Sequence, residues 1–210
     1  MTVNGFICPT KTAFGRKALE HLPFELFCAD AHRPLVLACQ DQLDQGIHRP
    51  LVNAFRDSQI PLCMAGVDLA DPDTLKQLHT GVREKGCDAL LVLGEGPLVN
   101  LAKQLELALS QGPEILRQDM GQLPPDSREL KAVPLILLPT RPETAWDFSG
   151  RVSRGTIQWS SPHLAPDLVC ISPELTRPPE DLSPILDAGF TALAVCTEVL
   201  TLADQSLAHP

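Results

Sequence analysis

The chain has 210 residues, which is enough for one domain with a sizeable core, or for one domain and part of a second. Hydrophobic residues make up 44% of it, but aromatic residues only 4%, so the core must be aliphatic, which favours an α/β protein over a β-sandwich. The net charge is −9 and no dense Lys/Arg cluster is present, so we expect no nucleic acid partner.

The amino terminus has no basic stretch followed by an apolar run, so we expect no signal peptide. No apolar run approaches the roughly 18 residues that span a bilayer, so we expect no membrane partner and a cytoplasmic location. The cysteines are dispersed without a CxxC pair, which predicts reduced and mostly buried thiols, with Cys87 and Cys196 in the core. The cysteines are Cys8, Cys28, Cys39, Cys63, Cys87, Cys170 and Cys196.

Strands and helices are predicted to alternate through the first half of the chain. The strands are predicted at 34–39, 60–66 and 87–93, and the helices at 46–58, 71–86 and 98–109. In the first helix, Leu51, Val52 and Phe55 share one face. Asp71 is expected to cap the second helix, with Pro72 in its first position. This alternation predicts an α/β fold, with a parallel sheet and crossover helices.

The second half continues the pattern after a segment rich in Pro, Gly and charge. The predicted elements are a surface excursion at 111–131 with a helical turn at 113–117, a strand at 133–138, a hairpin at 148–160 with its turn near Arg154 and Gly155, a strand at 167–171, and a helix from Asp181 or Ser183 to about Ala203.

The turn after the strand at 87–93 is a candidate ligand site. Parallel sheets bind ligands at the carboxyl ends of their strands, where this turn would lie. Gly94 and Gly96 would let the backbone approach a pyrophosphate closely, and the following helix would offer free N–H groups and its positive dipole end. A plain tight turn would carry the same glycines, so this motif alone leaves both interpretations open.

Several segments in order strengthen the cofactor interpretation. They are Ala13-Phe14-Gly15, the strand 35–39, Cys87 to Pro97, Leu101-Ala102-Lys103, Leu138-Pro139-Thr140, Pro166 to Leu175, and Ala188 to Leu193. Together they resemble the iron-containing (group III) alcohol dehydrogenase family, which is related to glycerol dehydrogenases and dehydroquinate synthases. The resemblance implies a Rossmann-like domain for NAD or NADP at 1–180, and at 181–210 the first helix of a helical domain that is cut short or absent.

By position, the family's Gly-Gly-Gly-Ser turn becomes Gly94-Glu95-Gly96-Pro97, and the Asp that usually follows becomes Asn100. Glu95 would repel an arriving pyrophosphate, because like charges in close contact are unfavourable. Pro97 removes a hydroxyl and a backbone N–H, both of which could donate to a phosphate.

The family's loop along the cofactor, Pro-Thr-Thr-x-Gly-Thr-Gly-Ser-Glu, corresponds to residues 139–147. Thr140 and Thr144 are retained, both glycines are replaced, and Trp146 is bulkier than the usual Ser. The position that would hold a ribose is Gln40, which tolerates a 2′-phosphate, so NADP is as compatible as NAD.

The metal ligands that the resemblance implies are replaced. The family's Gly-x-Asp-Ala-Leu-x-His segment reads 189–195 here, with Thr191 at the Asp position and Val195 at the His position. Val has no donor atom, and a neutral Thr hydroxyl is a poor ligand. The family's other two ligands are His residues of the helical domain, so we expect no metal.

The final helix is apolar around most of its circumference, which is typical of a helix buried on all sides. In the family, the second domain would cover one side. We therefore expect an exposed apolar patch that pairs with another copy or another protein.

These observations lead to a divergent member of the family, without metal-dependent dehydrogenase activity, that retains weak NAD(P) binding or serves as an interaction subunit. The alternative is an NAD(P)-dependent alcohol dehydrogenase that is truncated here or completed by another chain. A third hypothesis is metal-independent chemistry in the same crevice by Glu143, Asp147 and Arg141, although solvated loop charges would look the same.

Overall fold

The computed structural model describes residues 10–114, 132–141, 148–155, 157–176 and 183–207. Within these residues, parallel strands form one six-stranded sheet in the order β1-β8-β5-β4-β2-β3. The strands are β1 (Lys11–Phe14), β2 (Pro34–Cys39), β3 (Cys63–Val67), β4 (Ala89–Leu93), β5 (Leu135–Leu138) and β8 (Leu168–Ile171). The predicted α/β fold, a Rossmann-like parallel sheet with crossover helices, is confirmed.

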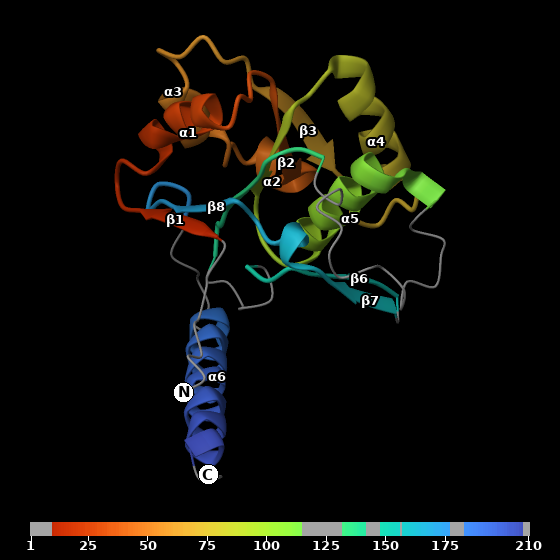
Figure 1. Ribbon diagram of the computed structural model, residues 1–210. Coiled ribbons are helices and arrows are strands. Elements are labelled where there is room, and N and C mark those ends of the chain that lie inside the picture. Colours follow the sequence, from red (N-terminus) through yellow and green to blue (C-terminus); the bar gives the residue numbers. More distant parts are fainter. Residues whose placement is uncertain (1–9, 115–131, 142–147, 156, 177–182, 208–210) are drawn as a thin grey trace.

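Helices cover both faces of this sheet (Figure 1). They are η1 (Leu19–His21), α1 (Leu22–Cys28), α2 (Gln40–Asp44), α3 (Arg49–Ala54), α4 (Thr74–Lys85), α5 (Pro97–Gln111) and η4 (Pro162–Leu164). Val36 and Leu91 pack in the cluster that contains α1 and α3, whereas Leu37 and Val92 pack in the cluster that contains α4 and α5. The central strands are continuously apolar because both of their faces are buried.

The predicted helix at 46–58 is wrong in its bounds. The chain instead forms α2 and α3, separated by a turn in which Gly46 has a φ of +76°. Pro50 lies in the first turn of α3, where its missing N–H costs no helical hydrogen bond, so the helix begins just before it. Leu51 and Phe55 are buried, but Val52, which was predicted on the same face, is 45% exposed.

The helix α4 begins at Thr74, with Asp73 at its N-cap, rather than at Asp71 as predicted. The Asp71 carboxylate accepts from the backbone N–H of Asp73 at 2.9 Å, so it stabilises the turn before the helix. The predicted end at Gly86 is confirmed, since Gly86 is the left-handed C-cap with a φ of +62°.

The first strand and helix of the domain were not predicted from periodicity. β1 is a half-polar edge strand that pairs with β8, and α1 is a short helix with Pro23 in its first turn. The predicted hairpin is confirmed as the antiparallel pair β6 (Arg151–Arg154) and β7 (Ile157–Ser160), with Gly155 at a φ of +59° in the turn. Of the predicted helical turn at 113–117, residues 113 and 114 form a 3-10 turn and the rest lies outside the described residues.

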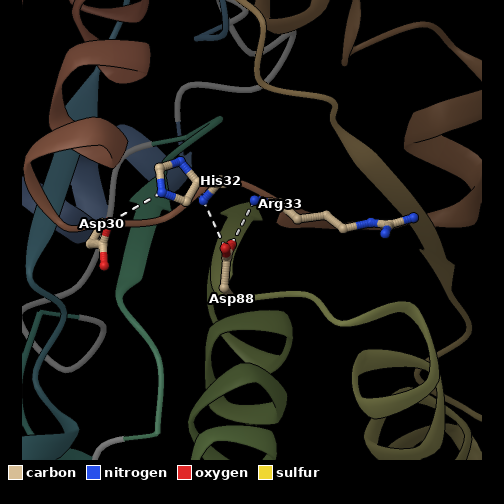
Figure 2. A network of polar contacts seen from close by, with 4 residues as sticks. All are labelled: Asp30, His32, Arg33 and Asp88. Atoms are coloured by element: carbon tan, nitrogen blue, oxygen red, sulfur yellow. Dashed lines mark hydrogen bonds and ion pairs between the residues drawn. The ribbon is translucent and has the colours of Figure 1, made fainter.

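A carboxylate ties the neighbouring strands β2 and β4 together at their amino ends (Figure 2). Asp88, just before β4, accepts from the backbone N–H groups of His32 and Arg33, just before β2, at 2.7 Å each. The His32 ring also lies 3.1 Å from Asp30 Oδ1. Asp88 therefore aligns β2 with β4, whose carboxyl ends flank the candidate site.

The last described helix, α6 (Ser183–Leu207), stands away from the sheet and its helices (Figure 1). It exposes large apolar side chains, as the sequence predicts; these are Ile185, Leu186, Phe190 and Leu193. Screening of the described residues found no helix with the length and hydropathy needed to cross a membrane. The division at residue 180 falls in the segment 177–182, outside the described residues, and stays a prediction.

The prediction of mostly buried thiols is wrong for the six cysteines that the structure describes. Cys87 and Cys170 are buried, but Cys28 and Cys196 are exposed. Cys196 was expected in the core because its helix is apolar, but its side chain is exposed. The described cysteines are free thiols, as predicted.

Candidate functional site

The strand order reverses between β2 and β4. The chain runs from β2 outward to β3 and then crosses back, so that β4 pairs with the other side of β2. Loops that leave neighbouring strands in opposite directions open a crevice at the carboxyl edge of a sheet, and ligands of α/β proteins bind there. Gln40 follows β2 and Gly94 follows β4, so the structure places both at this point.

The turn between β4 and α5 needs its two glycines for different reasons. Gly94 has a φ of +151°, and a Cβ there would lie 2.9 Å from Leu98 Cδ2, so a side chain would clash. Gly96 is the N-cap of α5, with a φ of +54° and a ψ of −114°. A Cβ on Gly96 would meet no atom within 4 Å, so the helix start opens onto free space.

Glu95 lies between these glycines, and its carboxylate is held by residues that follow β5. Thr140 Oγ1 donates to Glu95 Oε2 at 2.5 Å, and Arg141 Nε lies 3.4 Å from Glu95 Oε1. Thr140 is only 3% exposed, whereas the Arg141 side chain is mostly solvent-accessible. The sequence predicted Glu95 and Thr140 as separate cofactor contacts, but the structure joins them directly.

The start of α5 offers fewer free donors than a typical helix. Pro97 is its first residue and has no N–H. The N–H of Leu98 donates to Glu95 O at 3.2 Å, and that of Asn100 donates to Gly96 O at 3.0 Å. Pro97 therefore has no N–H that could donate to a phosphate, as predicted, and the N–H of Leu98 is already used within the turn.

The structure places the Asn100 side chain against the hairpin. Its Nδ2 donates to Ser153 O at 2.8 Å, and its Oδ1 accepts from Ser153 N at 2.7 Å. One turn further along, Lys103 is almost fully buried, and its Nζ donates to Ser149 O at 2.6 Å. These residues attach α5 to β6, so Asn100 has a structural role beside the cofactor role that the resemblance implies.

Gln40 lies over the end of β3. Its Nε2 donates to Asp44 Oδ1 at 2.9 Å, and a Cβ on Gly66 would lie 1.8 Å from its Oε1. Gly66 therefore leaves the room that the Gln40 side chain occupies. Gln40 is exposed at the carboxyl edge, as a residue that meets a ribose would be.

Sequence reasoning missed two residues on either side of Gln40. Cys39 ends β2, and burial together with the nearby charges of Asp41 and Glu95 raises the pKa of its thiol. Gln42 Oε1 is buried and has no hydrogen-bond partner in the described part of the protein, and it lies 3.7 Å from the position of a Cβ on Gly94. The signal that could have identified them was their place at the carboxyl end of a predicted buried strand, Cys39 as its last residue and Gln42 shortly after it.

Several predicted residues lie outside the described residues. They are Thr144 of the cofactor loop, together with Glu143, Trp146 and Asp147. Of the third hypothesis, only Arg141 can be placed, and it pairs with Glu95.

The residues at the family's metal positions do not fit a metal centre. Thr191 and Val195 lie on α6, and they provide one neutral hydroxyl and no imidazole or carboxylate. Throughout the described ranges, no three His, Cys, Asp or Glu side chains group as metal ligands would. We therefore derive no chemical step through a metal.

A separate hollow of about 270 Å³ lies between α4 and the edge strand β3. Its polar lining includes Asp68, Asp71 and Lys85, and none of the predicted site residues lines it. The glycine turn thus remains the candidate site.

The parallel sheet and its crossover helices define a Rossmann-like α/β domain. The model of the iron-containing alcohol dehydrogenase family matches residues 9–173, and the chain belongs to this family. A similar curated protein is the 4-hydroxybutyrate dehydrogenase of Cupriavidus necator, which is 26% identical over 176 residues, or 79% of this chain and 44% of the relative.

Similar solved structures share the fold. The NADH-dependent butanol dehydrogenase A of Thermotoga maritima has a TM-score of 0.68 and 22% identity, over 83% of this chain and 45% of its own. Sulfoacetaldehyde reductase of Bifidobacterium kashiwanohense, solved in complex with NAD⁺, has a TM-score of 0.68 and 16% identity, over 84% and 48%. The chain spans less than half the length of each of these relatives.

Proposed function

We propose that this chain is a nicotinamide dinucleotide-binding module of an oxidoreductase, and that it binds NAD or NADP weakly at the turn between β4 and α5. The observation that carries the proposal is the turn between β4 and α5, which lies where the strand order reverses and where a Cβ on Gly96 would meet no atom within 4 Å. Membership of the family supports it.

The proposed contacts follow the resemblance. The backbone from Gly94 to Pro97 would face the pyrophosphate, and Thr140 and Thr144 would lie along the cofactor. Gln40 would face the ribose, and its neutral amide leaves room for a 2′-phosphate, so NADPH is tested beside NADH. We further propose that the described residues carry out no metal-dependent hydride transfer by themselves, because Thr191 and Val195 supply no strong ligand. The cytoplasmic location stays a prediction.

The direct test is a titration of the purified chain with NADH and with NADPH, following nicotinamide fluorescence and melting temperature together. A ligand at about a hundred times its dissociation constant adds roughly 2.7 kcal/mol of stability to a protein with one site. Saturation with a matching rise in melting temperature is the expected result. No change in either signal at millimolar ligand would refute dinucleotide binding.

The alternative is an NAD(P)-dependent alcohol dehydrogenase that another chain, or further residues, would complete. Assays with simple alcohols, NAD⁺ or NADP⁺, and added Fe²⁺ or Zn²⁺ separate the two. We expect no turnover; measurable turnover would overturn the proposal that the described residues lack metal-dependent activity.

A second proposed role is contact with another copy or another protein through α6. The exposed side chains of Leu186, Phe190 and Leu193 favour it. A dilution series in light scattering should show association that weakens in a Phe190→Ser, Leu193→Ser variant. A monomer at every concentration would argue against contact between copies.

A further inference from the structure

The turn between β4 and α5 already contains a negatively charged group, the Glu95 carboxylate. The Glu95 carboxylate accepts from the Thr140 hydroxyl through one oxygen and pairs with the Arg141 guanidinium through the other. A hydroxyl and a guanidinium are the groups that would otherwise donate to a phosphate oxygen at this edge. Thr140 and Arg141 thus donate to Glu95, although a diphosphate would need the same two donors.

The negative charge of Glu95 would also repel the negative charge of a diphosphate. Glu95 lies directly before Gly96, where a Cβ would meet no atom within 4 Å. Its side chain is only 22% exposed, so water screens its charge less than at a fully exposed site. Burial raises the pKa of the Cys39 thiol at the end of β2, and the nearby charges of Asp41 and then Glu95 add to the shift, so the Glu95 charge also acts on the neighbouring strand.

We infer that Glu95 determines the affinity of this site as a built-in competitor of the ligand's diphosphate, occupying Thr140 and Arg141 until the diphosphate displaces it. The inference rests on the proposed dinucleotide binding and goes beyond it, because it assigns the weakness of that binding to one side chain. It predicts that removing the carboxylate strengthens the site.

The test compares three single variants with the parent chain, using fluorescence titration with NADH and NADPH and displacement by ADP. Glu95→Ala removes both the charge and the acceptor, and Glu95→Gln removes only the charge. Glu84→Gln makes the same charge change at an exposed position near the end of α4, away from the turn. Circular dichroism and melting temperature verify that each variant is folded.

We expect Glu95→Ala to bind NADH or NADPH at least about tenfold more tightly than the parent, which corresponds to about 1.4 kcal/mol. The affinity of Glu95→Gln should lie between those of Glu95→Ala and the parent, and the affinity of Glu84→Gln should match that of the parent. Thr140→Val should weaken binding in the Glu95→Ala background more than in the parent, because only there is the hydroxyl released to the ligand.

The two proposals fail in different ways. Equal, measurable affinities for the parent and Glu95→Ala would overturn the role of Glu95 and leave dinucleotide binding intact. A gain of the same size in Glu84→Gln would also overturn it, because net charge alone would then explain the effect. No binding by any folded variant at millimolar ligand would overturn both.

Discussion

The sheet and α6 are both rich in apolar residues, but they meet different surroundings. In β4 all five side chains are buried, between α1 and α3 on one face and α4 and α5 on the other. In α6, Phe190 is 67% exposed and Leu193 is 65% exposed, and the helix stands away from the sheet (Figure 1). An apolar pattern therefore shows that a segment tends to be buried, but not which surface buries it.

The difference matters for function because the two regions carry different predicted sites. Gln40, Gly94 and Thr140 follow the carboxyl ends of the neighbouring strands β2, β4 and β5, and this edge of the sheet can be tested with a small ligand. Thr191 and Val195 lie on α6, and among the described residues no three His, Cys, Asp or Glu side chains group as metal ligands would. The following predictions test this contrast between the sheet and α6.

The largest effect should appear in thiol labelling. Burial raises the pKa of Cys170, in β8, to about 12 from an ordinary value of 9.0, so its reactive thiolate is about a thousandfold rarer than that of an ordinary thiol. Cys196, in α6, is exposed. Treatment of the native protein with iodoacetamide at pH 8, followed by mass spectrometry, should modify Cys196 before Cys170. If both cysteines resist until the protein unfolds, α6 is covered in solution.

Truncation of a core residue should separate the two regions thermodynamically. Leu91→Ala, in the fully buried part of β4, should lower the free energy of unfolding by about 2–5 kcal/mol in urea titrations. Leu193→Ala, the matched change in α6, should alter it by less than about 0.5 kcal/mol. Similar losses for both variants would show that α6 packs against something as closely as β4 does.

The Asp88 carboxylate, at the amino ends of β2 and β4, should contribute less to the free energy of unfolding than the core residue Leu91. Asp88→Ala removes the acceptor for two backbone N–H groups, and we expect a loss of about 1–2 kcal/mol in the same titrations. His32→Ala is the control, because it removes only the exposed contact with Asp30 and keeps the backbone bond (Figure 2). An equal loss in the control would mean that the His32 ring, rather than Asp88, stabilises this end of the sheet.

The smallest effect is expected at the attachment of the hairpin to α5. Asn100→Asp, which restores the residue usual in the family, replaces the donor to Ser153 O with a carboxylate oxygen and should cost about 1 kcal/mol. Asn53→Asp, at an exposed position where the side chain accepts from Arg56, should be nearly neutral. If Asn100→Asp leaves the free energy of unfolding unchanged, this residue would matter for ligand binding rather than for stability.

Much of the fold was predictable because its signals are local. The continuous apolar runs in β2, β4 and β5, and the left-handed C-cap Gly86 of α4, follow from short stretches of sequence. β1 was missed because an edge strand with an exposed, half-polar pattern has no periodicity, and its only support is its pairing with β8. The helix bounds near Gly46 were missed because a turn with positive φ can interrupt an apolar periodicity.

The sequence by itself determined the α/β class, the family resemblance and the glycine turn, because these depend on residue type and order. Only the tertiary structure decided that Glu95 bonds with Thr140 and Arg141, that Asn100 holds the hairpin, and that Cys196 is exposed. Each of these depends on residues far apart in the chain, and their distances are fixed only when the strands pair and the helices pack.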